Sequence, residues 1–214
     1  MRIVGGRWRG TALAAVGKGD PGAHLRPTSD RVRESLFNVL SQGRHGDLVT
    51  GARVLDLFAG TGALGLEALS RGAASATFAE TGRPALALLD RNIARLKPEA
   101  ARVLKADATR LPPAPAPATL VFLDPPYGKA LGEKALPSAD AQGWTAPGTV
   151  ASWEESSEMA PPPGWELLDA RRYGGTWITL LQRTGCTRRP TSSTTAGPAR
   201  GRCWRRECSS RSSR

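Results

Sequence analysis

The chain has 214 residues, which is enough for one domain of ordinary size but not comfortably for two. Hydrophobic residues make up 40% of the chain, and this content excludes a wholly disordered protein. No run approaches the ~18 uncharged apolar residues of a membrane span, and no apolar signal-peptide core is present, so we expect a cytoplasmic protein. The net charge of +11 favours polyanionic partners.

The positive charge lies at the two ends of the chain. Residues 1–33 carry a net charge of +5 and residues 184–214 a net charge of +7, whereas residues 34–183 sum to −1. The three cysteines, at positions 186, 203 and 208, all fall in the last of these segments. An odd number of cysteines outside any core, with only two histidines in the chain, argues against a disulfide framework and a structural zinc site.

Residues 184–214 contain no Leu, Ile, Val or Phe, so they cannot bury enough apolar surface to fold. We expect a disordered basic tail, or a stretch that is not a native coding frame, because shifted reading of GC-rich DNA yields this mixture of residues. A dedicated RNA-binding tail is a weaker interpretation, since its arginines form no ordered motif.

The N-terminal region predicts a hairpin followed by a helix. Residues 2–4 and 11–13 flank a glycine-rich stretch that carries Arg and Trp, which indicates a short hairpin with a basic, aromatic tip. A glycine-rich loop continues to Pro27. Thr28, Ser29 and Asp30 then offer N-cap chemistry for a helix with apolar residues at 32, 36, 39 and 40, which share one face.

Strands and helices alternate in the rest of the chain. The alternation is typical of an α/β fold, a parallel sheet with helices on both faces that binds ligands at the carboxyl ends of its strands. The proline-rich segment 112–117 is an irregular connection. Strands are predicted at 53–58, 75–79, 102–104, 119–123, 149–153 and 176–181, with a weaker one at 165–170, and helices at 63–70 and 84–96.

A glycine motif follows the first of these strands. Gly60, Gly62 and Gly65 fit the pattern GxGxxG directly after a strand and at the opening of a helix. Glu80 closes the second strand, 18 residues past Gly62, where a carboxylate can accept both ribose hydroxyls of an adenosine. The glycine pattern by itself would be explained by ordinary turn glycines. The strand, the glycines, the helix and the acid together predict a nucleoside-containing cofactor.

Two further acids favour S-adenosylmethionine over NAD. Asp56, four residues before Gly60, would repel a pyrophosphate but suits a ligand that bears an amino group and a sulfonium. Asp107, after the third strand, is placed to meet an adenine amino group. An NAD oxidoreductase is disfavoured, since no proton relay follows the glycine motif. The predicted cofactor-binding residues are Asp56, Phe58, Gly60, Thr61, Gly62, Glu80 and Asp107.

The second motif is Asp124-Pro125-Pro126-Tyr127, at the end of an apolar strand. The two prolines stiffen the turn and remove two backbone donors, so its carbonyls are left as acceptors. Asp124 and the Pro125 carbonyl can accept both hydrogens of an exocyclic base amine, and Tyr127 offers an aromatic face for the extracted base. A Pro-Pro turn with a solvated Asp would be favoured if this motif stood without the glycine motif. We predict these four residues as the catalytic set.

At these residues the chain resembles a known family. Asp-Pro-Pro-Tyr with an upstream glycine loop looks like the amino-methyltransferases of nucleic-acid bases. The segments RIVGGRWRG (2–10), LRPTSDRVRE (25–34) and 56–67 are more specific and resemble the RsmD-type 16S rRNA guanine-N2 methyltransferases of bacteria. The likeness covers about residues 1–183. It implies a seven-stranded, mostly parallel Rossmann-like methyltransferase fold with a small N-terminal β-hairpin, and an S-adenosylmethionine cofactor.

Two features depart from the family pattern. The helix expected after Tyr127 is interrupted at Leu136-Pro137-Ser138, and Thr81-Gly82 follows Glu80 where a regular approach to a helix is expected. Neither departure touches the motifs, and the tail has no counterpart in the family. We therefore expect an N-terminal hairpin and basic extension at 1–27, a methyltransferase domain at 28–183 and a disordered tail at 184–214.

Basic residues near the N-terminus are candidates for RNA binding, because they cluster in one short region of an otherwise neutral protein. A solvated face is the alternative. His24 is interpreted as a surface histidine, and Glu154 and Glu155 as solvated charges. The predicted RNA-binding residues are Arg7, Trp8, Arg9, Arg26, Arg31 and Arg33.

The leading hypothesis is methyl transfer to a guanine N2 amine of small-subunit rRNA, alone or in an assembling 30S particle, by a monomeric enzyme without a metal. DNA adenine-N6 methylation is one alternative, although it usually needs a sizeable target-recognition region and no insertion here is long enough. A non-catalytic RNA-binding module is another, although the intact Asp124–Tyr127 motif speaks against it.

Overall fold

The computed structural model describes residues 1–14 and 29–185. Predictions for Arg26, His24, the three cysteines and nearly all of the tail lie outside the described residues. None of the helices in these two ranges is long and apolar enough to cross a membrane.

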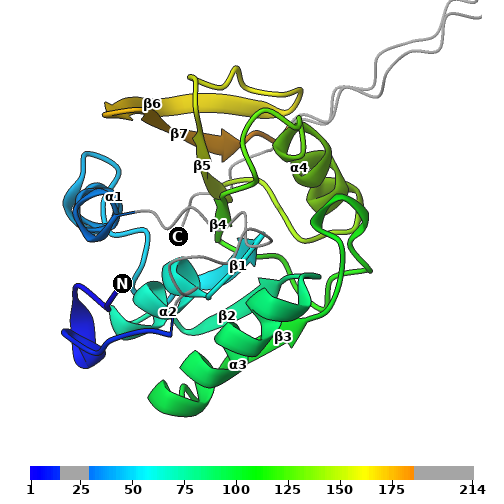
Figure 1. Ribbon diagram of the computed structural model, residues 1–214. Coiled ribbons are helices and arrows are strands. Elements are labelled where there is room, and N and C mark those ends of the chain that lie inside the picture. Colours follow the sequence, from blue (N-terminus) through cyan, green and yellow to red (C-terminus); the bar gives the residue numbers. More distant parts are fainter. Residues whose placement is uncertain (15–28, 186–214) are drawn as a thin grey trace, which may run out of the picture.

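The described part of the chain is built on one seven-stranded sheet with the order β3-β2-β1-β4-β5-β7-β6 (Figure 1). Neighbouring strands are parallel from β3 to β5, and β7 pairs antiparallel with both β5 and β6. The predicted seven-stranded, mostly parallel Rossmann-like sheet is therefore confirmed. The strands are β1 (Arg53–Leu57), β2 (Ser75–Ala79), β3 (Ala101–Leu104), β4 (Leu120–Leu123), β5 (Val150–Glu155), β6 (Trp165–Tyr173) and β7 (Thr176–Arg183).

Four α-helices and two short 3₁₀ turns complete the described structure. Ser29 caps the first helix, because its Oγ accepts a hydrogen bond from the Val32 N–H at 3.3 Å. The helices are α1 (Asp30–Gln42), α2 (Ala63–Ser70), α3 (Arg83–Leu96) and α4 (Gly132–Ala141), and the 3₁₀ turns are η1 (Gly6–Trp8) and η2 (Ala108–Arg110).

The expected interruption at Pro137 does not occur, since α4 runs through this proline. A proline inside a helix removes one backbone hydrogen bond. Leu136 and Ala139 on either side of it are fully buried against the sheet. Their burial stabilises the helix enough to offset the lost bond.

The alternation of side chains along β1 divides the core into two layers. Val54 joins the cluster formed with α1, α2 and α3, whereas Leu55 and Leu57 join the cluster formed with α4. Successive strand residues point to opposite faces, so an apolar strand of this kind is buried on both sides. Asp56 is the one polar residue among the buried positions of β1, and it lies near the carboxyl end where the parallel strands terminate.

The N-terminal segment pairs with itself only briefly. A single antiparallel bridge joins Arg2 and Ala12, and η1 forms the tip in place of a regular hairpin turn. The ladder stops because the next N–H groups, those of Val4 and Gly5, donate to a side chain of α2. Ile3 is fully buried in the core, so the segment packs as part of the fold.

Candidate functional site

The predicted site residues meet at one edge of the sheet. Strands β1 to β5 are parallel, so their carboxyl ends share this edge, and the antiparallel β7 begins there. The glycine motif follows β1, Glu80 follows β2 and Asp107 lies shortly after β3. The Asp-Pro-Pro-Tyr motif follows β4, next to β1 in the sheet. The fold thus brings the predicted cofactor-binding and catalytic residues to one edge.

The glycine loop between β1 and α2 is a tight turn with a left-handed backbone. Gly60 and Gly62 have φ values of +56° and +77°, and a Cβ on Gly62 would lie 2.4 Å from Leu89 Cδ1. Phe58 also adopts a left-handed conformation, with φ of +59°, which is strained for a residue with a side chain. Strain of this kind often occurs at ligand sites, although Lys97 and Ala130 among the described residues also have positive φ values.

Asp56 lies beneath the glycine loop. Its side chain is 2% exposed, and Oδ2 accepts a hydrogen bond of 2.9 Å from the Gly65 N–H at the start of α2. Burial raises the pKa of Asp56 to about 8, with the hydrogen bond from Gly65 acting in the opposite direction. This bond means that the Asp56 carboxyl supports the glycine loop from beneath, while its predicted contact with the amino and sulfonium groups of a ligand stays a prediction.

Glu80 joins the loops that follow β1 and β2. Its Oε2 accepts from the Gly60 N–H at 2.8 Å, and its Oε1 accepts from the N–H groups of Thr81 and Gly82 at 2.8 and 2.7 Å. These bonds explain the unexpected Thr81-Gly82 approach, because the short turn folds around the carboxylate before α3 begins. Glu80 is half-buried at the mouth of the glycine loop. It thus holds the loop in place and leaves lone pairs for a hydroxylated ligand.

Asp107 lies on the same edge and is exposed. Its Oδ1 caps η2 by accepting hydrogen bonds of 2.8 Å from both the N–H and the hydroxyl of Thr109. The cap fixes the direction of this carboxylate beyond the end of β3.

Asn92 is a residue that the sequence reasoning missed. Its Nδ2 donates to the Thr61 carbonyl at 2.9 Å, within the glycine loop, and to the Ala14 carbonyl at 3.2 Å. Its Oδ1 accepts from the Ala14 N–H at 2.7 Å. Asn92 is fully buried on α3, and one side chain thus ties the glycine loop to the N-terminal segment. A polar residue on the apolar face of a predicted helix was the available signal.

The Asp-Pro-Pro-Tyr loop is held by two glutamates at the end of β5. The Tyr127 hydroxyl donates to Glu154 Oε1 at 2.9 Å and lies 3.2 Å from Thr176 Oγ1 of β7. The Gly128 N–H donates to Glu155 Oε1 at 3.1 Å. Glu154 and Glu155 are 6% and 8% exposed, so their interpretation as solvated charges was wrong. They are buried because they bind the loop.

The environment of Tyr127 keeps its hydroxyl protonated. Partial burial, followed by the charge of Glu154, raises the pKa of Tyr127 well above its usual range, although the bond with Thr176 opposes this. In the same loop, Pro125 is buried and Asp124 is half-buried, so the loop lies at the boundary between the core and the surface. The hydroxyl is therefore a donor and not a base.

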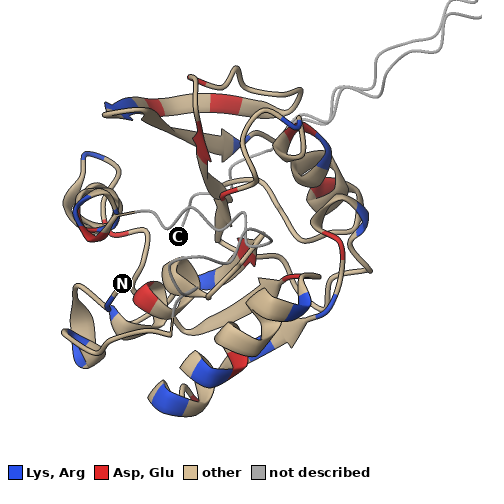
Figure 2. Cartoon of the chain, in the orientation of Figure 1, with Lys and Arg blue, Asp and Glu red and all other residues tan. Residues whose placement is uncertain are grey.

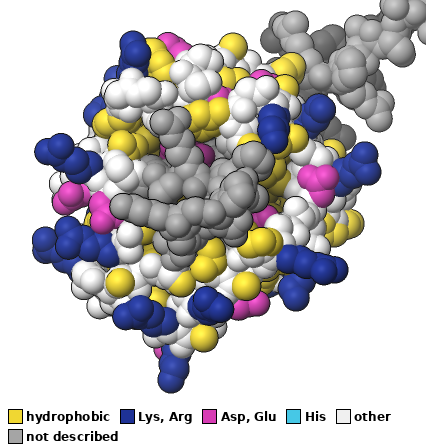
Figure 3. All heavy atoms as spheres, in the orientation of Figure 1, with side chains coloured by type: hydrophobic (Ala, Val, Ile, Leu, Met, Phe, Trp, Pro, Cys, Tyr) yellow, Lys and Arg dark blue, Asp and Glu magenta, His cyan; other side chains and the backbone are white. Residues whose placement is uncertain are grey.

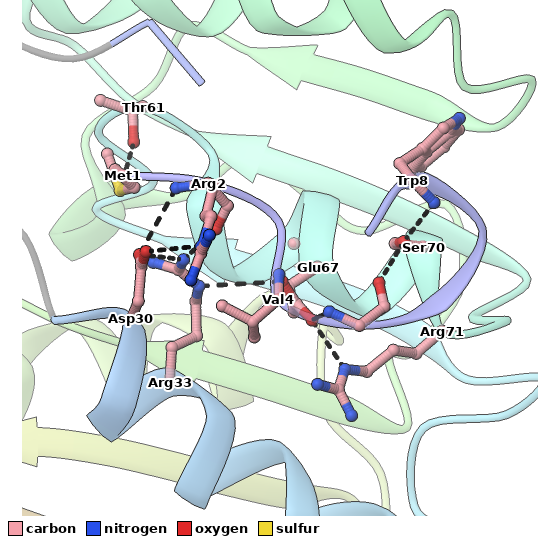
Figure 4. A network of polar contacts seen from close by, with 12 residues as sticks. Met1, Arg2, Val4, Trp8, Asp30, Arg33, Thr61, Glu67, Ser70 and Arg71 are labelled. Carbon is pink, nitrogen blue, oxygen red and sulfur yellow. Dashed lines mark hydrogen bonds and ion pairs between the residues drawn. The ribbon is translucent and has the colours of Figure 1, made fainter. Parts of the chain in front are cut away.

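Arg33 is not available to RNA. It is fully buried, and its guanidinium contacts the Arg2 carbonyl, the Asp30 carboxylate at 2.8 Å and Glu67 Oε2 at 3.8 Å (Figure 4). Its assignment as an RNA-binding residue is therefore wrong. The burial of Arg33 could not be predicted from the sequence, because one of its partners is Glu67 on α2, a helix that follows β1.

The remaining N-terminal cations that the structure describes are on the surface. Arg7, Arg9 and Arg31 are exposed, and the Arg7 guanidinium lies 3.9 Å from the ring centroid of the half-buried Trp8. Lys and Arg residues also occur on α3 and near the end of β6 (Figure 2). On the face shown in Figure 3 their side chains are spread around the margin. Basic side chains are thus not confined to the N-terminal region.

Glu67 anchors the N-terminal segment to α2, the helix that begins at the glycine loop (Figure 4). Its fully buried carboxylate accepts hydrogen bonds of 2.7 Å from the N–H groups of Val4 and Gly5 and from Arg71 Nε. Ser70, on the same helix, accepts from the Trp8 N–H at 3.0 Å. A carboxylate within the apolar helix 63–70 was the signal for this buried anchor.

Residues 1–14 and 29–185 contain no group of three or more His, Cys, Asp and Glu side chains placed to hold a metal ion.

Comparisons with known proteins show the family to which the chain is related. The family described as Conserved hypothetical protein 95 matches residues 1–182. The chain is 41% identical over 187 residues to Ribosomal RNA small subunit methyltransferase D of Escherichia coli K12, covering 86% of this chain and 90% of the relative. It is 35% identical over 189 residues to the protein of the same name from Haemophilus influenzae, covering 85% and 93%.

A solved structure, yhhF from Escherichia coli, is 38% identical with a TM-score of 0.73 and covers 87% of this chain and 99% of that one. Sequence and fold thus match over nearly the whole described range. The chain therefore belongs to the Conserved hypothetical protein 95 family and is an RsmD-type methyltransferase.

Proposed function

We propose that this protein transfers a methyl group from S-adenosylmethionine to the exocyclic N2 amine of a guanine in small-subunit rRNA. One observation carries the proposal: a strained glycine loop and an Asp-Pro-Pro-Tyr loop lie at the ends of the adjacent strands β1 and β4. The names of the relatives, ribosomal RNA small subunit methyltransferase D, support an rRNA substrate.

The residues around the glycine loop fit S-adenosylmethionine. Gly62 has a φ of +77° and no room for a Cβ beside Leu89, so the tight turn of this loop requires glycine there. Glu80 would hold the ribose hydroxyls and Asp107 the adenine amino group, while Asp56 supports the loop without adding a full negative charge at neutral pH. When bound, the cofactor supplies a methyl group activated by its sulfonium.

The Asp-Pro-Pro-Tyr loop would orient the base. Asp124 and the Pro125 carbonyl accept the two amine hydrogens, so that the nitrogen lone pair faces the methyl group. As the new N–C bond forms, the C–S bond breaks and the amine nitrogen gives up one proton. The protonated Tyr127 hydroxyl cannot take that proton, which leaves the Asp124 carboxylate or solvent as the acceptor. Catalysis then rests mainly on positioning.

The proposal is tested by methyl transfer from labelled cofactor to 30S particles, naked 16S rRNA and duplex DNA, with mass analysis of the methylated nucleosides. We expect N2-methylguanine in rRNA and none in DNA. Asp124→Ala should lower the rate by roughly 100-fold or more while cofactor affinity stays within a few-fold. Asp90→Ala, at an exposed position on α3, is the matched control and should leave both unchanged.

The other outcomes separate the alternatives. Methylated adenine in DNA would replace the rRNA assignment. Binding of RNA without any methyl transfer would indicate a non-catalytic module. Near-normal single-turnover methylation by Asp124→Ala would contradict the orienting role of this carboxylate.

A further inference from the structure

We infer that Glu154 is a positioning residue for the reaction, acting through the Tyr127 hydroxyl to fix the aromatic ring against which the target base stacks. The inference rests on the proposed function, since it assigns a role within the same site. Its starting point is the 2.9 Å hydrogen bond from the Tyr127 hydroxyl to Glu154 Oε1, with Thr176 Oγ1 at 3.2 Å from the same hydroxyl.

The burial of Glu154 requires an explanation. All six residues of β5 are buried, and Glu154 is 6% exposed. Taking a carboxylate out of water is unfavourable unless it is hydrogen-bonded, and an apolar residue would complete an interior strand more favourably. Glu154 lies at the end of β5 that borders the Asp-Pro-Pro-Tyr loop, so its charge is placed where it can bind that loop.

The two contacts of the Tyr127 hydroxyl come from different strands. Glu154 belongs to β5 and Thr176 is the first residue of β7, the strand that pairs with β5. A ring that is fixed at its hydroxyl by two strands and at its backbone by the turn has little freedom to rotate. The adjacent bond from the Gly128 N–H to Glu155 restrains the chain immediately after the ring.

Glu154 acts on the ring and not on the reacting nitrogen. The Tyr127 hydroxyl remains a donor because partial burial and the nearby carboxylate raise its pKa. The pair therefore consists of a neutral phenol donating to a carboxylate, a charge-assisted bond that is short and directional. A glutamine at position 154 retains an oxygen that can accept the same bond, whereas alanine does not.

The test is a double-mutant cycle with Glu154→Ala, Glu154→Gln and Tyr127→Phe on the full-length protein. We expect Glu154→Ala to lower kcat by on the order of tenfold or more, while cofactor affinity stays within twofold, because a small displacement of a positioned group slows the reaction steeply. Tyr127→Phe should cause a similar loss. The double variant should be no slower than Tyr127→Phe, since both changes remove one bond.

Two variants provide a conservative comparison and a control. Glu154→Gln should recover most of the wild-type kcat with an unchanged pH profile. Glu166→Gln, at an exposed glutamate of β6, should behave like the wild type. Glu154→Ala leaves a gap in a buried strand, so a second variant is needed that loosens the Tyr127 ring without this gap. Thr176→Val removes the other contact of the Tyr127 hydroxyl and should also lower kcat.

The outcomes are distinguishable from failure of the proposed function. If the wild type does not methylate rRNA, the proposed function fails. Two results with an active wild type would overturn the positioning role. One is a loss of kcat in the double variant that equals the combined losses of Glu154→Ala and Tyr127→Phe. The other is an inactive Glu154→Gln variant that folds and binds the cofactor normally.

Discussion

Replacement of Glu67 by Gln should destabilise the protein strongly, because this carboxylate is the centre of a buried polar network. It is fully buried and accepts three hydrogen bonds of 2.7 Å, two from the backbone of Val4 and Gly5 and one from Arg71, with Arg33 at 3.8 Å. Glutamine keeps the shape but directs an NH₂ group at a donor and removes the negative charge that faces Arg71 and the buried Arg33, which keeps only Asp30 as a carboxylate partner.

The expected loss follows from the kind of bond removed. Removing one partner from a buried ion pair typically destabilises by about 3–5 kcal/mol, a large part of the ~5–15 kcal/mol that keeps a domain folded. With a urea m-value of about 2 kcal/mol/M, the unfolding midpoint should fall by about 2 M. Amide hydrogen exchange should also accelerate at Val4 and Gly5, whose N–H groups lose their acceptor.

Urea unfolding followed by tryptophan fluorescence and far-UV circular dichroism measures this loss. Glu34→Gln, at an exposed glutamate of α1, is the control and should change stability by less than about 0.5 kcal/mol. A loss below about 1 kcal/mol for Glu67→Gln, with unchanged exchange at Val4 and Gly5, would refute the claim that this carboxylate anchors the N-terminal segment.

Three other predictions concern the loop, the cofactor and RNA. The contribution of Asp56 to stability is fully present below its unfolded pKa, near 4, and is lost as pH rises through its folded pKa of about 8. The urea midpoint of unfolding of Asp56→Asn, measured at pH 5, 7 and 8.5, should therefore rise relative to the wild-type midpoint as the pH increases. Glu80→Ala should weaken S-adenosylmethionine binding by ~2–3 kcal/mol in calorimetry, and unchanged affinity would place the ribose contact elsewhere. Alanine at Arg7, Arg9 and Arg31 should reduce the salt slope of RNA binding by roughly 0.7–0.9 for each lost phosphate contact. These changes should impair methylation of 30S particles more than deletion of residues 184–214, although the deletion removes a charge of +7 and the substitutions +3; the opposite ranking at high salt would contradict an N-terminal RNA site.

Local signals predicted the elements well. The predicted helix 63–70 and strand 75–79 coincide with α2 and β2, because glycines and short apolar runs mark both ends of these elements. The helix after the Asp-Pro-Pro-Tyr loop was harder to predict, since the proline at 137 is a local signal that packing overrides.

The sequence did not predict which charged side chains are buried. Arg33 and Glu154 look like surface residues in the sequence, because a charged side chain is buried only where a partner meets it. At least one partner is distant in sequence: Tyr127 is 27 residues from Glu154, and Arg33, which also pairs with Asp30 three residues away, meets Glu67 of α2. The positions of motif residues at strand ends were predictable, whereas the contacts that fix them depend on the tertiary fold.

The position of Asn92 has a consequence for energetic coupling. One amide side chain holds both the Thr61 carbonyl of the glycine loop and the backbone of Ala14, so the free energies of the two segments are not independent. Linkage is reciprocal: if a ligand on the glycine loop tightens binding at the N-terminal segment by some factor, a ligand on that segment tightens binding at the loop by the same factor. Occupancy of the two ligands would then rise together. In Asn92→Ala, the affinity for each ligand should no longer depend on the concentration of the other.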